Sequence, residues 1–327
     1  MQKRDIKIDL LKTVAIILMS FVHVNSLIYT GKGFLDSVTY LGATVCFSMF
    51  LFSIGYIQGK KIGEGKELTW KNVLKSSLQV YIPYLILGFI STLIFKPDFV
   101  PLDFLKMVIF AYLPNYVEFL VAFIFYYLFV KIAYKPLKRY MGNVYVLIMV
   151  AIISFGISIF LSRIDITNPI LLWLQTHLVG SRLTAVHSFP LLAYMPVYIS
   201  ALLLSKYGGK VGYSWSFSIS FLFLVLLEVF GARQWYRWPP SLPFILYGIL
   251  FISLLMFLFE FVQESKSLEK ITLMGKYPML SLLYLTSLAF LLKILPLKDV
   301  PVLLIWVLNI AVLVFGYMGV WLSKKRN

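Results

Sequence analysis

Apolar runs of 16 to 22 residues recur along the chain, and short breaks rich in Lys, Gly or Pro separate them. About twenty helical residues are needed to cross the hydrocarbon core of a membrane, so each run predicts a transmembrane helix. A soluble helical bundle would instead carry polar faces on its helices, and few appear here. The helices are expected at residues 8–29, 39–58, 74–95, 117–134, 144–162, 189–205, 214–231, 243–263, 279–294 and 302–322.

Residues 103–113 form one further apolar stretch, which is too short to span and ends at Pro114. We expect this stretch to be an interfacial or re-entrant segment. No soluble domain, internal repeat or low-complexity tract interrupts the pattern. The sequence therefore predicts an all-α, polytopic membrane protein of about ten transmembrane helices, forming a single integral-membrane domain over residues 1–327.

Composition supports lipid as the solvent, because 60% of the residues are hydrophobic and only 13% are charged. Soluble domains carry about twice that charged fraction. A net charge of +16 would suggest a nucleic-acid partner in a soluble protein. Here the basic residues cluster in short loops, so we expect no nucleic acid. The single cysteine, Cys46, excludes an intrachain disulfide, and the first run lacks a small-residue cleavage site for a signal peptide.

The basic residues also predict orientation, because cytoplasmic loops carry an excess of Lys and Arg. Ten spans put both termini on one side of the membrane. Of the 30 Lys and Arg residues, 20 fall on that side, 9 fall on the other, and Lys12 lies within the first span. We therefore expect both termini in the cytoplasm of a multi-pass protein of the cell membrane. Counting residues 103–113 as a span would weaken this bias.

Polar residues in the first run are the strongest sign of chemistry. Asp9, Lys12 and His23 interrupt an otherwise apolar span, and polar groups at membrane depth usually have partners or a function. Lys12 and His23 are eleven residues apart, which puts them on one helix face and separates them by roughly 16 Å along the axis. An imidazole suits a general base, and a cation suits a phosphate-bearing ligand. The alternative is structural, with Lys12 snorkelling to the interface and His23 bonded to a neighbouring helix.

The first run resembles the first-helix signature of the transmembrane acyltransferase superfamily. That superfamily includes acyltransferase family 3 and the heparan-α-glucosaminide N-acetyltransferase catalytic family. The matching pattern is Asp-Leu-Leu, a basic residue, ten residues and then His. Further similar segments follow in the order of the family: FSMFLFSIGYIQGKK (47–61), YIPYLI (81–86), SFPLLAYMPVYISALLLSK (188–206), RWPPSLPFILYGILF (237–251) and MGKYPMLSLLYLTSLAF (274–290).

The chain departs from that pattern at three places. Lys12 stands where family 3 carries Arg, and Thr286 stands where a His often follows Leu-Tyr. The basic residue common before the third-helix proline is absent, with Gln79 and Val80 there instead, so Lys75 is the candidate substitute. Lys and Arg are not interchangeable at bidentate phosphate sites, so these departures bear on donor binding.

The resemblance implies that an acyl group, most often acetyl, moves from acyl-CoA to a hydroxyl or amine of a glycan, lipid or related acceptor. Acyl-CoA is then a co-substrate, and no permanently bound cofactor is expected. His23 would act as general base or carry the acyl group transiently. Lys12, with Lys75, would bind the phosphates of the donor.

Other charged residues offer further candidates. Glu118 opens the fourth span, where a carboxylate can orient His23, although a structural role is the alternative. The outer loops carry arginines that we interpret as a cationic rim for the acceptor, with a solvated or lipid-headgroup face as the alternative: Arg163, Arg182, Arg233 and Arg237. The spacing of His177 and His187 matches no metal-binding pattern, and we expect no metal site.

Two other classes of function stay open. A transporter or flippase for a lipid-linked or polar substrate fits ten spans with buried polar residues, although such folds often show inverted repeats and broken helices, and neither is evident. A purely structural membrane protein leaves the Lys12 and His23 stripe unexplained. The residues do not determine the acceptor, the acyl chain or the oligomeric state.

Overall fold

The computed structural model describes residues 4–28, 33–182, 188–231, 237–295 and 300–325. Within these ranges the chain is helical, and the only β feature is an isolated bridge between Arg237 and Pro240. The long helices are α1 (Ile6–Ile28), α2 (Phe34–Gly63), α3 (Trp70–Phe95), α5 (Phe119–Ile132), α7 (Val144–Leu161), α9 (Met195–Tyr207), α10 (Lys210–Val229), α11 (Leu242–Phe259), α14 (Pro278–Ile294) and α15 (Val302–Lys325). The short ones are α4 (Pro101–Val108), α6 (Tyr134–Tyr140), α8 (Pro169–Leu178), α12 (Lys266–Ile271) and α13 (Leu273–Lys276).

Each of the ten predicted spans contains a helix. Seven are long and apolar enough to cross a membrane, namely α1, α2, α3, α7, α10, α11 and α15. The pair α5 and α6 passes the same test as one unit bent by 71°, and α14 is a shorter apolar helix. The chain is thus an all-helical, multi-pass membrane protein, as the hydrophobic pattern predicts.

Two of the expected segments differ from the structure in detail. The helix expected at 189–205 begins only at Met195, because Pro196 is tolerated in the first turn of a helix but Pro190 would interrupt an earlier one. Between the spans expected at 144–162 and 189–205, residues Pro169–Leu178 form the short helix α8, for which the sequence pattern gave no prediction. Asn168 caps that helix by accepting hydrogen bonds from the N–H groups of Ile170 and Leu171.

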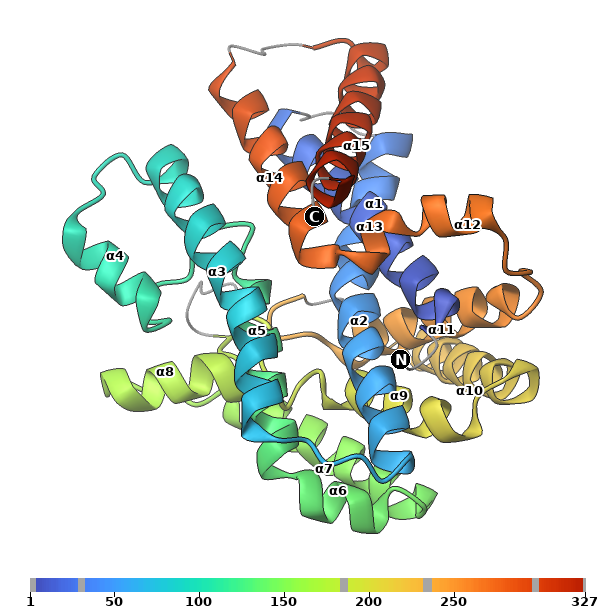
Figure 1. Ribbon diagram of the computed structural model, residues 1–327. Coiled ribbons are helices and arrows are strands. Elements are labelled where there is room, and N and C mark those ends of the chain that lie inside the picture. The colour runs from blue at the N-terminus through green and yellow to red at the C-terminus, as the bar shows by residue number, and fades with distance from the viewer. Residues whose placement is uncertain (1–3, 29–32, 183–187, 232–236, 296–299, 326–327) are drawn as a thin grey trace.

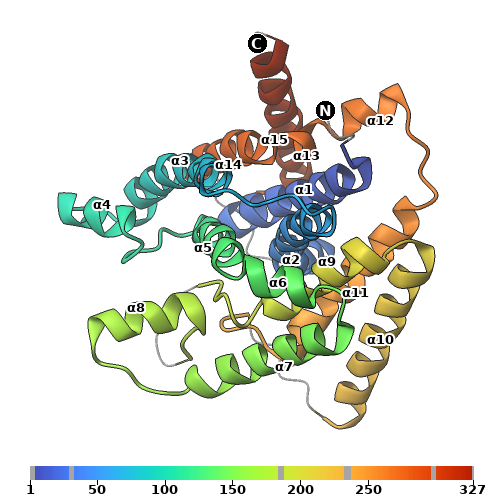
Figure 2. The ribbon, with the colours of Figure 1, turned by 60° about the horizontal axis from the view of Figure 1, so that its bottom comes forward.

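Helix α1 is the centre of the bundle. It packs against α2, α11, α13, α14 and α15, and Figures 1 and 2 both show it enclosed by these elements. The polar groups Asp9, Lys12 and His23 of α1 are all buried, at 5%, 9% and 5% exposure. The most polar span predicted from the sequence is therefore among the most enclosed, where polar groups need partners.

Glycines let α2 approach α9 closely and α13 approach α1 closely. A Cβ added at Gly55 of α2 would lie 2.9 Å from the Cβ of Ala201, and one at Gly59 would lie 2.2 Å from Oγ of Ser205. This spacing of two glycines on one face permits the tight crossing of α2 and α9. At Gly275 of α13 the added Cβ would lie 1.9 Å from the Asp9 carbonyl oxygen, so only glycine fits against α1 there.

Candidate functional site

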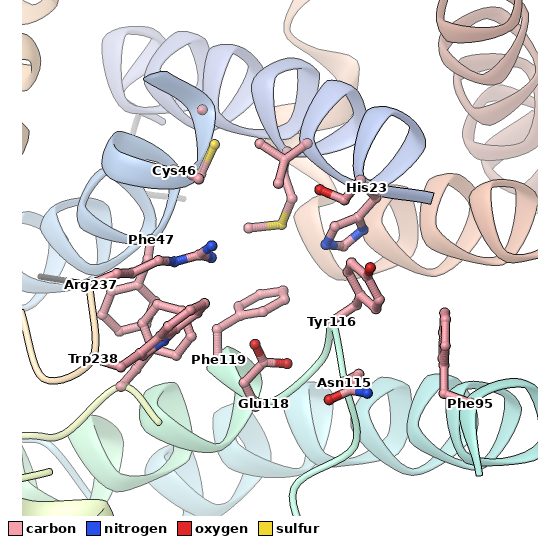
Figure 3. A pocket seen from close by; sticks show the side chains of 16 residues that line it. His23, Cys46, Phe47, Phe95, Asn115, Tyr116, Glu118, Phe119, Arg237 and Trp238 are labelled. Carbon is pink, nitrogen blue, oxygen red and sulfur yellow. The ribbon is translucent and has the colours of Figure 1, made fainter. Parts of the chain in front are cut away.

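A cavity of about 330 Å³ lies beside the second half of α1, and we call it the His23 cavity. Figure 3 shows side chains from several elements converging on it. It is lined by Met19, Val22, His23, Ser26, Gly42, Ala43, Cys46, Phe47, Phe95, Asn115, Tyr116, Glu118, Phe119, Phe189, Arg237 and Trp238. Its walls are mostly apolar with a few convergent polar groups, which is the usual composition of a small-molecule site.

The His23 cavity brings together three of the residues proposed from the sequence. His23 comes from α1, Glu118 precedes α5, and Arg237 lies shortly before the start of α11. Figure 3 shows their polar ends directed into the same space. The charge of Arg237 is close enough to act on both His23 and Glu118. The sequence predicts Arg237 as part of an outer cationic rim for the acceptor, and the structure places it in the lining of the His23 cavity.

The imidazole of His23 is held by two contacts. Its Nδ1 lies 3.3 Å from the hydroxyl oxygen of Thr286, on α14. The ring of Tyr116 packs edge-on against it, with 5.5 Å between ring centroids. The residue that positions His23 is therefore Thr286, which the sequence marked only as a departure from the family pattern.

Glu118 does not take the role of orienting His23 in this structure. In the described part of the chain, its buried Oε2 has no hydrogen-bond partner. The segment before it makes a tight turn in which Tyr116 adopts a φ of 69°, a left-handed backbone that costs a non-glycine residue roughly 1–2 kcal/mol. Such conformations concentrate at functional sites, where packing enforces them. The result is a carboxylate that faces the cavity with hydrogen-bonding capacity unused.

Arg237 also reaches the cavity without using all of its donors. Its guanidinium carbon lies 4.2 Å from the centroid of the Trp238 ring and 5.9 Å from that of Phe189. The aromatic faces stabilise the cation by cation–π attraction. Among the residues that the structure describes, its buried Nε finds no hydrogen-bond acceptor. The guanidinium is thus placed on apolar rings with donor capacity available for a ligand.

Two further cavities lie at the other end of α1, and Lys12 lines both. The Lys12 cavity, of about 180 Å³, lies between α1, α2, α3, α5 and α14. A larger space of about 1030 Å³, which we call the vestibule, is bounded by α1 and the end of α2. Its basic lining residues are Arg4, Lys12, Lys60, Lys61 and Lys206, and its acidic ones are Asp5, Asp9 and Glu64. Five cations against three carboxylates leave the vestibule net basic.

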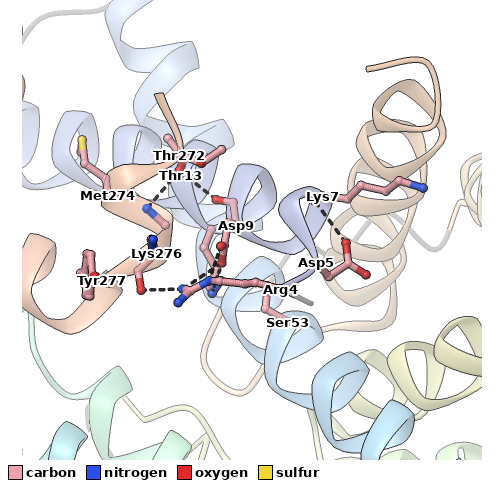
Figure 4. Close-up of polar contacts among 12 residues, drawn as sticks. Arg4, Asp5, Lys7, Asp9, Thr13, Ser53, Thr272, Met274, Lys276 and Tyr277 are labelled. Carbon is pink, nitrogen blue, oxygen red and sulfur yellow. Dashed lines mark hydrogen bonds and ion pairs between the residues drawn. The ribbon is translucent and has the colours of Figure 1, made fainter. Parts of the chain in front are cut away.

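Ion pairs hold the base of the vestibule together. Lys12 Nζ lies 2.8 Å from Oδ1 of Asp9, and Arg4 pairs with the same carboxylate. Figure 4 shows Arg4 bridging from Asp9 to the backbone carbonyl of Lys276, to which it donates a hydrogen bond at 2.6 Å. Asp9 therefore binds two cations, and the charge of Lys12 is only partly neutralised.

An aromatic partition separates the Lys12 cavity from the His23 cavity. On α2, Phe47 lines the His23 cavity and Phe50, one turn later, lines the Lys12 cavity. Phe123 of α5 lies against both, stacked on Phe47 with 5.2 Å between ring centroids and edge-on to Phe50 at 6.0 Å. The two spaces thus follow one another along α1 with one layer of rings between them.

The remaining residues proposed from the sequence lie elsewhere. Lys75 is on the exposed side of α3 and lines none of these cavities. Arg163 and Arg182 are exposed and do not line the His23 cavity, while Arg233 lies outside the described residues. Lys61, in the last turn of α2, lines both cavities beside Lys12. The sequence does not single it out, because it cannot distinguish one lysine near a helix end from another.

In the described ranges, no three His, Cys, Asp or Glu side chains come together as metal ligands. Comparisons with protein-family models, with curated proteins and with solved structures find no match for this chain. The site must therefore be interpreted from its own geometry.

Proposed function

We propose that this protein is a membrane-bound acyltransferase that moves an acyl group from acyl-CoA to a hydroxyl or amine acceptor. The observation that carries the proposal is the His23 cavity, where an imidazole, a carboxylate and a guanidinium face one space. A net basic vestibule at the other end of the same helix supports it, because the phosphates of acyl-CoA require cations.

In the proposed reaction, His23 acts as general base. This role requires the tautomer with its hydrogen on Nδ1, which donates to the Thr286 hydroxyl and leaves the Nε2 lone pair to remove the acceptor proton. The acceptor oxygen or nitrogen attacks the thioester carbonyl, and the carbonyl electrons move to oxygen. Arg237 stabilises this oxyanion. The carbonyl then re-forms as the C–S bond breaks, and the CoA thiolate takes the proton back from the His23 imidazolium.

Donor binding is assigned to Lys12 and Lys61 rather than to Lys75, since the first two line the vestibule. The acyl end of the donor must then pass the Phe47 and Phe123 rings to reach His23. In this account the rings move aside when the donor binds, and they exclude water from the His23 cavity when it is absent.

The reaction requires the vestibule to face the cytoplasm, where acyl-CoA is made. We infer ten spans with both termini cytoplasmic, from the 20-to-9 division of basic residues. In a Cys46→Ala background, single cysteines replacing Lys61 and Lys138 should react with a membrane-impermeant thiol reagent from the same side. A cysteine replacing Arg163 should react from the opposite side. Labelling of positions 61 and 138 from opposite faces would contradict the ten-span arrangement.

The direct test of the proposed function is incubation of the purified protein with labelled acetyl-CoA and a membrane extract. We expect a labelled hydroxyl- or amine-bearing product. Because Cys46 is the one thiol of the chain and lines the His23 cavity, alkylation should inactivate the wild-type protein, and acetyl-CoA should slow this inactivation.

Cavities in line along a helix also suit a transporter. Transfer of a polar solute into sealed vesicles, without any acylated product, would favour that alternative.

Lys12→Ala is expected to raise KM for acetyl-CoA about tenfold with little change in kcat, since one charge-assisted contact to phosphate is lost. Asp9 keeps Arg4 as its partner, so the variant should still fold. Lys12→Arg should retain activity, and donor KM should rise with salt in the wild type. The matched control is Lys7→Ala, because Lys7 pairs with Glu260 at 2.7 Å and lines neither donor cavity. An unchanged donor KM in folded Lys12→Ala would remove Lys12 from the site.

A further inference from the structure

A fourth cavity adjoins the His23 cavity on the side of α8, and we call it the Trp173 cavity. It encloses about 490 Å³, within the range of small-molecule sites. Its lining residues include Phe110, Asn115, Glu118, Trp173, Thr176 and His177. Asn115 and Glu118 line both cavities. A ligand in the Trp173 cavity is therefore separated from the His23 cavity only by this short segment.

The aromatic wall of the Trp173 cavity is fixed in place by one backbone carbonyl. Trp173 Nε1 donates to the carbonyl oxygen of Phe110 at 3.2 Å, and Nε2 of His177 lies 3.0 Å from the same atom. A carbonyl only accepts, so His177 Nε2 carries the hydrogen. Phe110 itself is held at a φ of 60°. The indole is thus preorganised, with a half-buried ring beside open space.

The residues that line this cavity do not suit an anionic acceptor. No Lys or Arg is among its lining residues. Burial lowers the pKa of His177 to about 4, so its imidazole is neutral at physiological pH. The one group that can be ionic is Glu118, whose Oε2 is buried and has no hydrogen-bond partner in the described part of the chain. With no Lys or Arg among the lining residues, an anionic ligand would find no counter-charge, whereas a ligand bearing hydroxyl donors would satisfy the Glu118 oxygen.

The helices beside the cavity carry apolar outer faces. On α8 the exposed large residues are Ile170, Leu171, Leu174 and Leu178, and on α4 with its C-terminal cap they are Leu102, Phe104, Leu105 and Ile109. Figures 1 and 2 show α4 and α8 on one flank of the bundle. Neither helix is long enough to span, so both fit the membrane interface, with apolar faces in lipid. The cavity that α8 lines is therefore close to the bilayer surface.

We propose that the Trp173 cavity is the acceptor subsite and binds an uncharged, hydroxyl-bearing sugar ring. The ring stacks on the Trp173 indole, its hydroxyls bond to Asn115, Thr176 and the Glu118 carboxylate, and one hydroxyl extends past Glu118 toward His23. This assignment rests on the proposed function. The cationic rim expected from the sequence, for a polar or anionic acceptor, included Arg163 and Arg182, and neither lines this cavity.

The experiment measures binding and transfer separately, with the full-length protein in lipid nanodiscs. The probes are methyl glucoside, a dodecyl glucoside inserted in the bilayer and, as an anionic comparison, phosphatidylglycerol. We expect a glucoside to raise the melting temperature of the wild type, since a ligand that binds only the folded state stabilises it. Transfer of labelled acetyl to the glucoside is measured in parallel. A lower KM for dodecyl glucoside than for methyl glucoside would identify the acceptor as a lipid-linked sugar. Equal KM values would identify it as a free sugar.

Trp173→Ala should raise the glucoside KM about tenfold and leave the acetyl-CoA KM unchanged. Thr176→Val replaces a hydroxyl by a methyl of similar shape and should raise the glucoside KM several-fold. This variant tests the subsite if Trp173→Ala does not fold. Trp215→Ala, at an exposed position of α10, is the matched control. Glucoside binding without transfer would support the subsite while refuting the acyltransferase. Acyl transfer to phosphatidylglycerol or another acceptor, with no glucoside binding, would overturn the subsite while supporting the acyltransferase.

Discussion

Replacing His23 with alanine should lower kcat for acyl transfer by about 10² to 10⁴, the usual cost of losing a general base. The physical reason is that no other group in the His23 cavity can replace it. Glu118 faces the same space, but its buried Oε2 has no hydrogen-bond partner among the described residues, and the Cys46 thiol is buried. The measurement is the rate of labelled acetyl transfer by purified protein with the same melting temperature as the wild type.

Two variants separate this role from packing. Val24→Ala truncates the buried neighbour of His23 on α1, which does not line the cavity, and should retain near-normal turnover. Thr286→Val removes the hydroxyl that lies 3.3 Å from Nδ1 and should lower kcat while sparing donor KM. Thr286→Ser should restore activity. Wild-type turnover in His23→Ala would exclude His23 as the base.

Replacing Arg237 with glutamine should lower kcat by about 10² to 10³, the typical effect of removing one group that stabilises an oxyanion. The guanidinium reaches the His23 cavity across aromatic rings, and its Nε has no acceptor in the described structure, which leaves this donor for developing charge. Arg237→Lys keeps the charge but loses the planar fork, and we expect partial activity. Steady-state kinetics with both substrates would measure the effect.

The division between kcat and KM decides what Arg237 does. A role in the transition state lowers kcat, whereas a role on an acceptor-binding rim raises acceptor KM and leaves kcat unchanged. Arg139→Gln, on the exposed face of α6, is the matched control for loss of one positive charge. An increase in acceptor KM alone would show that Arg237 binds the acceptor, as the sequence pattern suggests, and does not stabilise the transition state.

The sequence by itself determined where helices form and that lipid surrounds them. In a bilayer every backbone polar group must be bonded within the chain, so long apolar runs become helices whatever their neighbours are. Helical periodicity alone placed Lys12 and His23 on one face of α1. The end of α5 and the start of α9 were less determined, because in short helices tertiary contacts and prolines decide the boundaries.

Only the tertiary structure decided which groups surround His23. Thr286 and Arg237 are more than two hundred residues away in the chain, and no local pattern connects them to α1. Their positions depend on how α14 and the segment before α11 pack on the bundle, which is set by close contacts such as Gly275 against Asp9. A basic residue near the end of an apolar run has the same sequence signature whether it faces lipid, water or a cavity. Charge and hydropathy therefore could not separate Arg237 from Arg163, or Lys61 from Lys75, and packing alone made the distinction.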